Sequence, residues 1–343
     1  MGRNQYRYYN IIVKKYINIL TALILLASCA KSEVSYEASG EVTLAPVKGN
    51  VTKAEGNSGA LKDLENPPML HIWSRWDQDA DHWYIDDDLF AYNDSYKAWA
   101  GEQGSYPWPL NGSLTFAGYT HPTTTSYVPG YHYEENFFSF NKYVNDEFDF
   151  CWFGLTEGYN NKNNGDAVPV VLNHALSWIT IKAYGEGTPV GKWIINSLTL
   201  ESAINKGKAI CYGDTSDGTT GKAIWEAEVS LENHTGDYIL KQKINHTIEE
   251  PKVEGTTKTG TLLTDNIIIP QTPTNLIINY SYQDGTETRT DSKKVSLKLN
   301  EGNTTKWLSG VHYTYTLVFK SNDIQVAPSF GTWGSADQNI TVE

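Results

Sequence analysis

The chain has 343 residues, of which 40% are hydrophobic and 13% aromatic, and it carries a formal net charge of −13 with only 3 cysteines. The apolar content excludes global disorder, and the cysteine count excludes a disulfide-dense scaffold. The acidic charge argues against nucleic acid, because proteins neutralise its phosphates with Lys and Arg. The length suits two domains of ordinary size.

The N-terminus predicts an export signal. Basic residues precede an apolar run at 17–27, which is shorter than the about 20 residues that cross a bilayer. The run ends in Leu26-Ala27-Ser28-Cys29, the order of a bacterial lipobox, in which the Cys thiol is acylated and becomes the first mature residue. We therefore predict a signal peptide at 1–28 and lipid on Cys29, with a soluble body held at the membrane by that lipid alone.

Residues 29–53 predict a tether that contains one strand. The strand-like stretch is Glu41–Ala45, and a soft, polar segment with an exposed basic site at Lys53–Ala54 follows it.

The middle of the chain predicts strands. Residues 148–153 and 175–182 are short apolar runs rich in aromatic and β-branched side chains, of strand length. One short helix is predicted at 88–100, where Leu89, Tyr92, Tyr96 and Trp99 recur at helical spacing.

The C-terminal third alternates apolar and polar residues, as antiparallel sheets with one wet face do. Strands are predicted around 276–282, 295–299 and 313–320, and Asp284-Gly285 predicts a tight hairpin turn between the first two. The prediction is an all-β protein with two tandem β-sandwich domains. We place an N-terminal domain at 54–205 and a C-terminal domain at 206–343.

Four aspartates have the spacing of a calcium loop. Asp77, Asp79, Asp81 and Asp88 fall at positions 1, 3, 5 and 12 of such a loop. However, His82 stands where the tight turn requires Gly, and Asp88 is shorter than the usual bidentate Glu. A solvated acidic loop without a metal is the preferred interpretation.

Aromatic residues crowd the stretch between residues 73 and 108. Exposed aromatic rings are stacking platforms for sugars, and buried ones fill the core of a loop-rich sandwich. The sequence favours packing and leaves glycan contact as the alternative. The tryptophans concerned are Trp73, Trp76, Trp83, Trp99 and Trp108.

No motif for catalysis or for a cofactor stands out. Cys151 and Cys211 either pair as a disulfide or remain buried thiols, and two cysteines are too few for a metal site. There is no GxSxG, CxxC or HExxH motif and no phosphate-binding loop. We expect no enzymatic activity and no cofactor.

Several short motifs follow one another along the chain. They are the lipobox at Cys29, Thr52-Lys53-Ala54, His174-Ala175-Leu176 before the strand 177–183, Trp307-Leu308-Ser309-Gly310 before Tyr313-Thr314-Tyr315, Ile324-Gln325-Val326 and Gly331-Thr332-Trp333. In this order they resemble the fimbrillin-like lipoproteins of the Bacteroidales, the type V pilins. The resemblance spans nearly the whole chain and is firmest at 170–200 and 307–343.

The resemblance implies two transthyretin-like sandwiches, export to the outer membrane and assembly into a fimbria by strand exchange. In the family, a trypsin-like protease cuts after a basic residue and releases the first strand with the lipid. The vacated groove then accepts a C-terminal strand of the next subunit. Carried onto this chain, the cut falls at Lys53–Ala54 and the donor lies within 324–343. The implied partners are other fimbrial subunits, and shaft, tip and anchor roles all stay open; a surface lipoprotein that binds glycans is the alternative.

Overall fold

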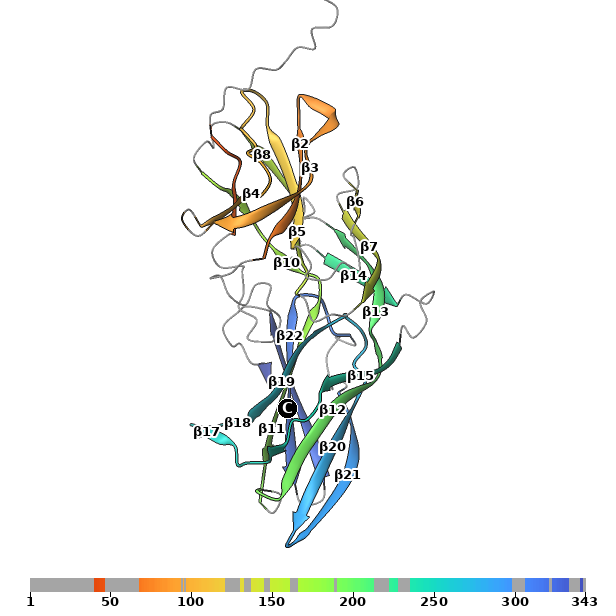
Figure 1. Ribbon diagram of the computed structural model, residues 1–343. Coiled ribbons are helices and arrows are strands. Elements are labelled where there is room, and N and C mark those ends of the chain that lie inside the picture. Colours follow the sequence, from red (N-terminus) through yellow and green to blue (C-terminus); the bar gives the residue numbers. More distant parts are fainter. Residues whose placement is uncertain are drawn as a thin grey trace, which may run out of the picture. The chain divides into compact units, whose positions relative to one another are not determined.

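The computed structural model describes residues 40–46, 68–93, 95, 97–120, 130–132, 137–144, 149–160, 166–187, 190–212, 222–227, 235–297, 306–320, 323–332 and 340–341. Within these ranges the ordered elements are strands, and none of them is a helix (Figure 1). The predicted all-β fold is confirmed. The signal peptide, Cys29, Lys53 and Ala54 lie outside the described residues.

The largest sheet has eight strands, in the order β10-β8-β5-β2-β3-β4-β1-β9. Its central strands are mostly antiparallel, and β1 runs parallel to the edge strand β9. The strands are β1 (Leu44–Pro46), β2 (Leu70–Trp76), β3 (Asp79–Asn93), β4 (Ala98–Gly101), β5 (Leu114–Thr120), β8 (Cys151–Tyr159), β9 (Val168–Val170) and β10 (Asn173–His174).

A four-stranded sheet packs on one face of this eight-stranded sheet. A buried cluster joins Trp73, Tyr119 and Trp152 of the large sheet to Phe138 and Cys211 of the small one. The small sheet has the order β14-β13-β7-β6, and its strands are β6 (Gly130–His132), β7 (Phe137–Val144), β13 (Lys206–Tyr212) and β14 (Lys222–Ala227). The two sheets form one sandwich.

Two five-stranded sheets form a second sandwich. One has the order β19-β11-β22-β23-β24, and the other has the order β15-β12-β20-β21 with β16 paired to β12. Their strands are β11 (Ser177–Gly185), β12 (Trp193–Ile204), β15 (Thr235–Lys241), β16 (His246–Thr247), β19 (Thr261–Ile268), β20 (Asn275–Asp284), β21 (Glu287–Ser296), β22 (Val311–Lys320), β23 (Asp323–Thr332) and β24 (Ile340–Thr341). A separate two-stranded ribbon pairs β17 (Lys252–Glu254) with β18 (Thr257–Thr259).

The core of the second sandwich follows from the alternation seen in the sequence. Ile179 and Ile181 of one sheet, and Leu276 and Ile278 of the other, are fully buried in one cluster. Strand residues two apart point to the same face, so each strand contributes one apolar row. The predicted hairpin is present, because β20 and β21 pair around a turn in which Gly285 has a φ of +65°.

Strand pairing crosses the boundary predicted near residue 205. The strands β11 and β12, which the sequence analysis placed in the N-terminal domain, hydrogen-bond to β22 and β20 of the C-terminal third. The next strand, β13, returns to the first sandwich and pairs with β7. Residues 39–343 form one compact unit, so a division into tandem domains at 205 stays a prediction.

The predicted helix at 88–100 is wrong. The segment is instead a hairpin of β3 and β4, in which Tyr92 stands opposite Trp99 and the two rings meet edge-on with centroids 5.3 Å apart. The turn is supported by Asn93, whose side-chain oxygen accepts a hydrogen bond from the Ser95 amide at 2.9 Å. The fully buried Trp99 also donates from Nε1 to the Pro68 carbonyl at 2.8 Å. Burial of its large ring outweighs the local helical spacing.

Candidate functional site

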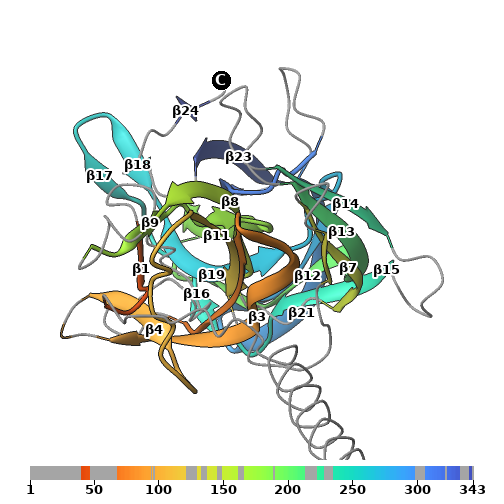
Figure 2. The ribbon, with the colours of Figure 1, turned by 90° about the horizontal axis from the view of Figure 1, so that it is seen from above.

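The candidate site is the groove that β1 occupies in the eight-stranded sheet. The strand lies between β4 and β9, with Leu44 opposite both Trp99 and Val168, and Figure 2 shows it between those two neighbours. The chain before β1 continues the pairing through a bridge between Glu41 and Pro107. The predicted tether strand at Glu41–Ala45 therefore overlaps a real strand that has neighbours on both sides.

Besides the ladder bonds of β1, further backbone hydrogen bonds hold residues 40–43 to the sheet. The Val42 amide donates to the Tyr106 carbonyl at 2.8 Å, the Val168 amide donates to the Thr43 carbonyl at 2.7 Å, and the Trp108 amide donates to the Gly40 carbonyl at 3.1 Å. Each such bond contributes about 0.5–1.5 kcal/mol net. The segment acts as an integral strand of the sheet.

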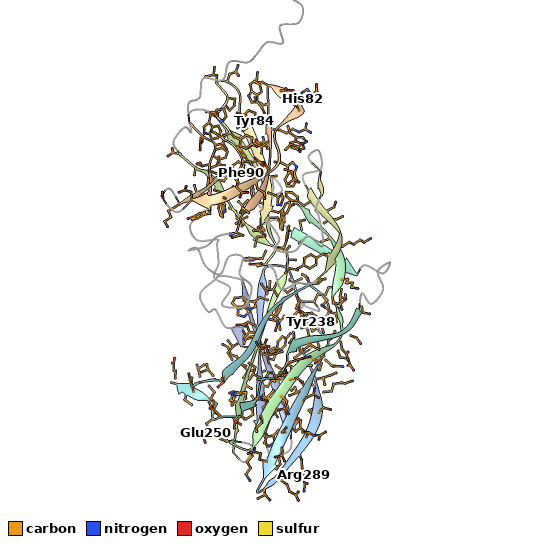
Figure 3. The ribbon with its side chains drawn as sticks, viewed as in Figure 1. His82, Tyr84, Phe90, Tyr238, Glu250 and Arg289 are labelled. Carbon is orange, nitrogen blue, oxygen red and sulfur yellow. The ribbon has the colours of Figure 1, made fainter. Side chains whose placement is uncertain are left out.

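The side chains of the segment fill the core beneath it. Val42 is 1% exposed and Leu44 is 0% exposed, and both belong to a cluster that includes Ile72, Phe90 and Phe116. The Phe90 side chain, labelled in Figure 3, also stacks on the Tyr106 ring with centroids 5.8 Å apart. Removing β1 would therefore uncover both an apolar groove and unpaired backbone groups on two strands.

The stretch that leaves β1 carries the predicted processing site. It runs from residue 47 to residue 67 and includes Lys53 and Ala54, all outside the described residues. Among the residues that the structure does describe, no helix is long and apolar enough to cross a membrane.

The predicted C-terminal donor is in part an ordinary strand. β23 pairs with β22 along its whole length, from Asp323 opposite Lys320 to Thr332 opposite Val311. Ile324 is 5% exposed and belongs to the core of the second sandwich. β24 pairs with β23 through Ile340 and Thr341 only, and residues 333–339 and 342–343 lie outside the described residues.

The five tryptophans predicted as ligand contacts are mostly core residues. Trp99 and Trp108 are 0% exposed, and Trp73 and Trp76 are also buried, so none of these four offers a ring face to a sugar in this structure. Trp83 is half-buried and lies under the Arg75 guanidinium, whose carbon is 4.3 Å from the ring centroid.

Three of the four aspartates of the predicted acidic loop, Asp77, Asp79 and Asp88, contact different partners. Asp77 accepts hydrogen bonds from Gln78 at 3.0 Å and from Ser113 at 2.9 Å, and the bond from Gln78 is the largest cause that lowers its pKa. Asp79 contacts His82 at 3.0 Å, and that hydrogen bond lowers its pKa. Figure 3 labels His82 on the hairpin of β2 and β3.

Asp88 takes part in a different contact from the other aspartates. It accepts hydrogen bonds from the Tyr106 hydroxyl and from the Leu89 amide. Burial and the Asp88 carboxylate raise the pKa of Tyr106 to about 12. Asp81 is exposed. Within the described ranges, these four carboxylates do not come together as a set of metal ligands.

Cys151 and Cys211 are both buried free thiols. The sequence left open whether they form a disulfide, and in the structure they do not. Cys211 lies on β13. Cys151 begins β8, directly opposite His174 in the antiparallel register with β10. Its Sγ is 3.2 Å from His174 Nδ1, and the same Nδ1 is 3.0 Å from Asp149 Oδ1.

Asp149, Cys151 and His174 form a site that the motif search missed. All three side chains are buried, and their ligand atoms lie within 4.8 Å of one another. No named motif has this spacing, but Asp149 and Cys151 are two residues apart and so share one face of an extended chain. His174 faces them across the ladder, where the side chains of paired residues meet.

The arrangement does not fit nucleophilic catalysis. In a Cys-His-Asp triad the two imidazole nitrogens contact different partners, whereas here Nδ1 contacts both Cys151 and Asp149. Burial raises the pKa of the Cys151 thiol, and the nearby Asp149 carboxylate raises it further. A thiol that keeps its proton is a poor nucleophile.

Comparisons with known proteins give matches in structure. No protein-family model matches the chain, and no curated protein matches it in sequence. A fimbrial protein from Bacteroides vulgatus ATCC 8482 aligns over 85% of this chain and 99% of its own, with 15% identity and a TM-score of 0.53. A proposed cell adhesion protein from Bacteroides uniformis ATCC 8492 covers 86% and 99%, with 12% identity and a TM-score of 0.49.

A fimbrial assembly protein from Parabacteroides distasonis ATCC 8503 aligns over 84% of this chain and 94% of its own, with 10% identity and a TM-score of 0.38. The neighbours are thus fimbrial and adhesion proteins of the Bacteroidales, at low identity. The Bacteroides vulgatus match shows a shared fold across nearly the full length of that protein.

Proposed function

We propose that this protein is a non-catalytic structural subunit of a cell-surface fimbria, exported as an outer-membrane lipoprotein through Cys29. One observation carries the proposal. The strand β1 is buried between two strands, and its covalent connection to the strands that follow is the segment 47–67, which contains Lys53. The fold shared with a fimbrial protein supports the same conclusion.

The proposed assembly step is the exchange of β1. Cleavage after Lys53 would produce a fragment that contains the lipid-bearing N-terminus and β1. Only non-covalent contacts would then hold this fragment to the sheet. Its departure would uncover the facing edges of β4 and β9 and the core around Phe90. An extended strand from another subunit would satisfy the same backbone groups and fill the same groove, as in other cases of strand addition.

The position of the subunit in the fimbria depends on its C-terminal strand. A shaft subunit must release a donor strand, whereas β23 is fully paired and Ile324 is buried in its own core. This favours a tip or anchor role, or a donor confined to residues 333–343. Direct adhesion through Trp83 and the surrounding loops is the weaker alternative, because four of the five tryptophans are buried.

The test is limited proteolysis of the form that begins at Ala30. The product of a trypsin-like protease is run unboiled on a denaturing gel, and the new N-terminus is sequenced. We expect cleavage at Lys53–Ala54 and loss of the β1 fragment; Lys53→Gln should prevent this cut, and Lys62→Gln is the matched control that should not.

The gel pattern then separates the roles. A ladder that collapses on boiling would indicate a shaft subunit that both accepts and donates a strand. A trimmed monomer that captures an added strand from a second subunit would indicate a tip or anchor. A product that retains the β1 fragment after cleavage, and binds no strand, would refute strand exchange.

A further inference from the structure

We propose that Asp149, Cys151 and His174 bind one Zn²⁺ ion, which fastens β10 to β8. Among the described residues this is the group in which three potential metal ligands converge. The ligands are a carboxylate oxygen, a thiol sulfur and an imidazole nitrogen. Zn²⁺ takes all three of these donors, whereas Ca²⁺ and Mg²⁺ take oxygen.

The separations are close to those of a tetrahedral zinc site. With usual zinc–ligand distances, two ligands at a tetrahedral angle are about 3.4 Å apart for nitrogen and oxygen and about 3.6 Å apart for nitrogen and sulfur. The Nδ1 atom of His174 is 3.0 Å from Asp149 Oδ1 and 3.2 Å from Cys151 Sγ. Each separation would have to grow by about 0.4 Å, which small side-chain rotations can supply.

A second observation, on the Asp149 carboxylate, supports a bound cation. Asp149 is 0% exposed, and its Oδ2 atom is buried without a hydrogen-bond partner. Buried carboxylate oxygens are normally hydrogen-bonded or bound to a cation, because leaving them unsatisfied is costly. A zinc ion bound by Asp149 would neutralise this carboxylate, and a water molecule would take the fourth position, as in zinc sites with three protein ligands. On binding, the Cys151 thiol would form a sulfur–zinc bond and release its proton to solvent.

The backbone makes the site rigid and explains what an ion would do there. Cys151 and His174 are register partners, and the Cys151 amide is fixed by a 2.9 Å hydrogen bond to Thr120 Oγ1. β10 has only two residues and lies at the edge of its sheet, just before the chain enters β11 of the other sandwich. Zinc would hold this short strand more firmly than its few ladder bonds can.

The experiment measures metal content and ligand identity in the full-length chain. After loading with Zn²⁺ and dialysis against metal-free buffer, elemental analysis should find about one zinc per chain, and zinc should raise the melting temperature. Cys151→Ser should abolish both effects. Cys211→Ser is the matched control, since Cys211 is equally buried but lies outside the group, and it should retain both.

Cobalt gives a readout that does not depend on the variants folding. Co²⁺ bound to a thiolate produces a sulfur-to-metal charge-transfer band in the near ultraviolet, and the wild-type chain should show it. Absence of this band in the wild type, no retained zinc, or zinc retained unchanged in a folded Cys151→Ser variant would each overturn the proposal.

Discussion

Replacing Leu44 with alanine tests whether side-chain burial holds β1 in its groove. Leu44 is 0% exposed within the core of the eight-stranded sheet. A Leu→Ala change at such a site costs about 2–5 kcal/mol, the lost transfer energy plus the energy of the cavity. Once the chain is cut after Lys53, this cost falls on the affinity of the β1 fragment. A change of about 1.4 kcal/mol is tenfold, so the dissociation constant should rise about 30-fold to about 4,000-fold.

The assay follows release of the β1 fragment after cleavage, by mass spectrometry of the fraction that passes a size filter. Thr43→Ala is the matched control. The Thr43 side chain is half-buried and points to the opposite face of the strand, and its carbonyl still accepts from the Val168 amide. A change of this kind alters stability by about 0.5 kcal/mol or less. Equal release from the two variants would show that the apolar face of β1 does not hold it.

Two further changes test the cores of the two sandwiches. Gly118→Ala should destabilise by about 1–3 kcal/mol, because overpacking strains a close-packed core and the new Cβ would lie 2.6 Å from the His71 carbonyl oxygen. Gly104→Ala, where nothing lies within 4 Å, should leave the urea midpoint nearly unchanged; equal midpoints for both variants would contradict this packing. In the second sandwich, burial and then the Lys182 charge lower the pKa of His312 to about 4. As the pH falls, the unfolded chain therefore takes up this proton before the folded chain does, and the free energy of unfolding should fall by about 2–3 kcal/mol between about pH 6.5 and about pH 4. A His312→Gln variant should lose this part of the pH dependence in urea titrations. The same pH dependence in the variant and the wild type would refute the assignment to His312.

The C-terminal strands were predictable because their pattern is local. Alternation from Leu276 to Tyr282, followed by Asp284-Gly285, specifies a hairpin within a stretch of about twenty residues, and the register pairs Leu276 with Val295 as alternation requires. The same reading of local periodicity gave a wrong prediction, a helix, for the segment 88–100. Tyr92 and Trp99 are spaced as on a helix and also stand opposite each other in a hairpin, and local periodicity cannot separate these arrangements.

Pairings between distant segments were not predictable from patterns. Nothing in the sequence of β13 indicates that it joins a different sheet from β12 and pairs with β7, a strand more than 60 residues earlier. The group of Asp149, Cys151 and His174 could not be predicted for the same reason, because it depends on a pairing between distant segments. The two-residue spacing of Asp149 and Cys151 is visible in the sequence, but the third ligand depends on the register of β10 with β8.

The contrast between β1 and β23 limits the models of assembly. β1 and the residues just before it contribute Leu44 and Val42 to the core. One segment, 47–67, connects β1 covalently to the strands that follow, so a single cut leaves it held by non-covalent contacts alone. β23 pairs with β22 over ten residues and contributes Ile324 to the core of the second sandwich. These contacts would have to break before β23 could leave. Donating β23 would open the second sandwich at the moment of assembly, whereas donating only 333–343 would leave that core intact. We therefore expect a deletion of 333–343 to abolish any polymerisation without lowering the melting temperature, while a deletion from 324 onward should unfold the second sandwich. If the shorter deletion still polymerised, the donor would have to be sought elsewhere in the chain.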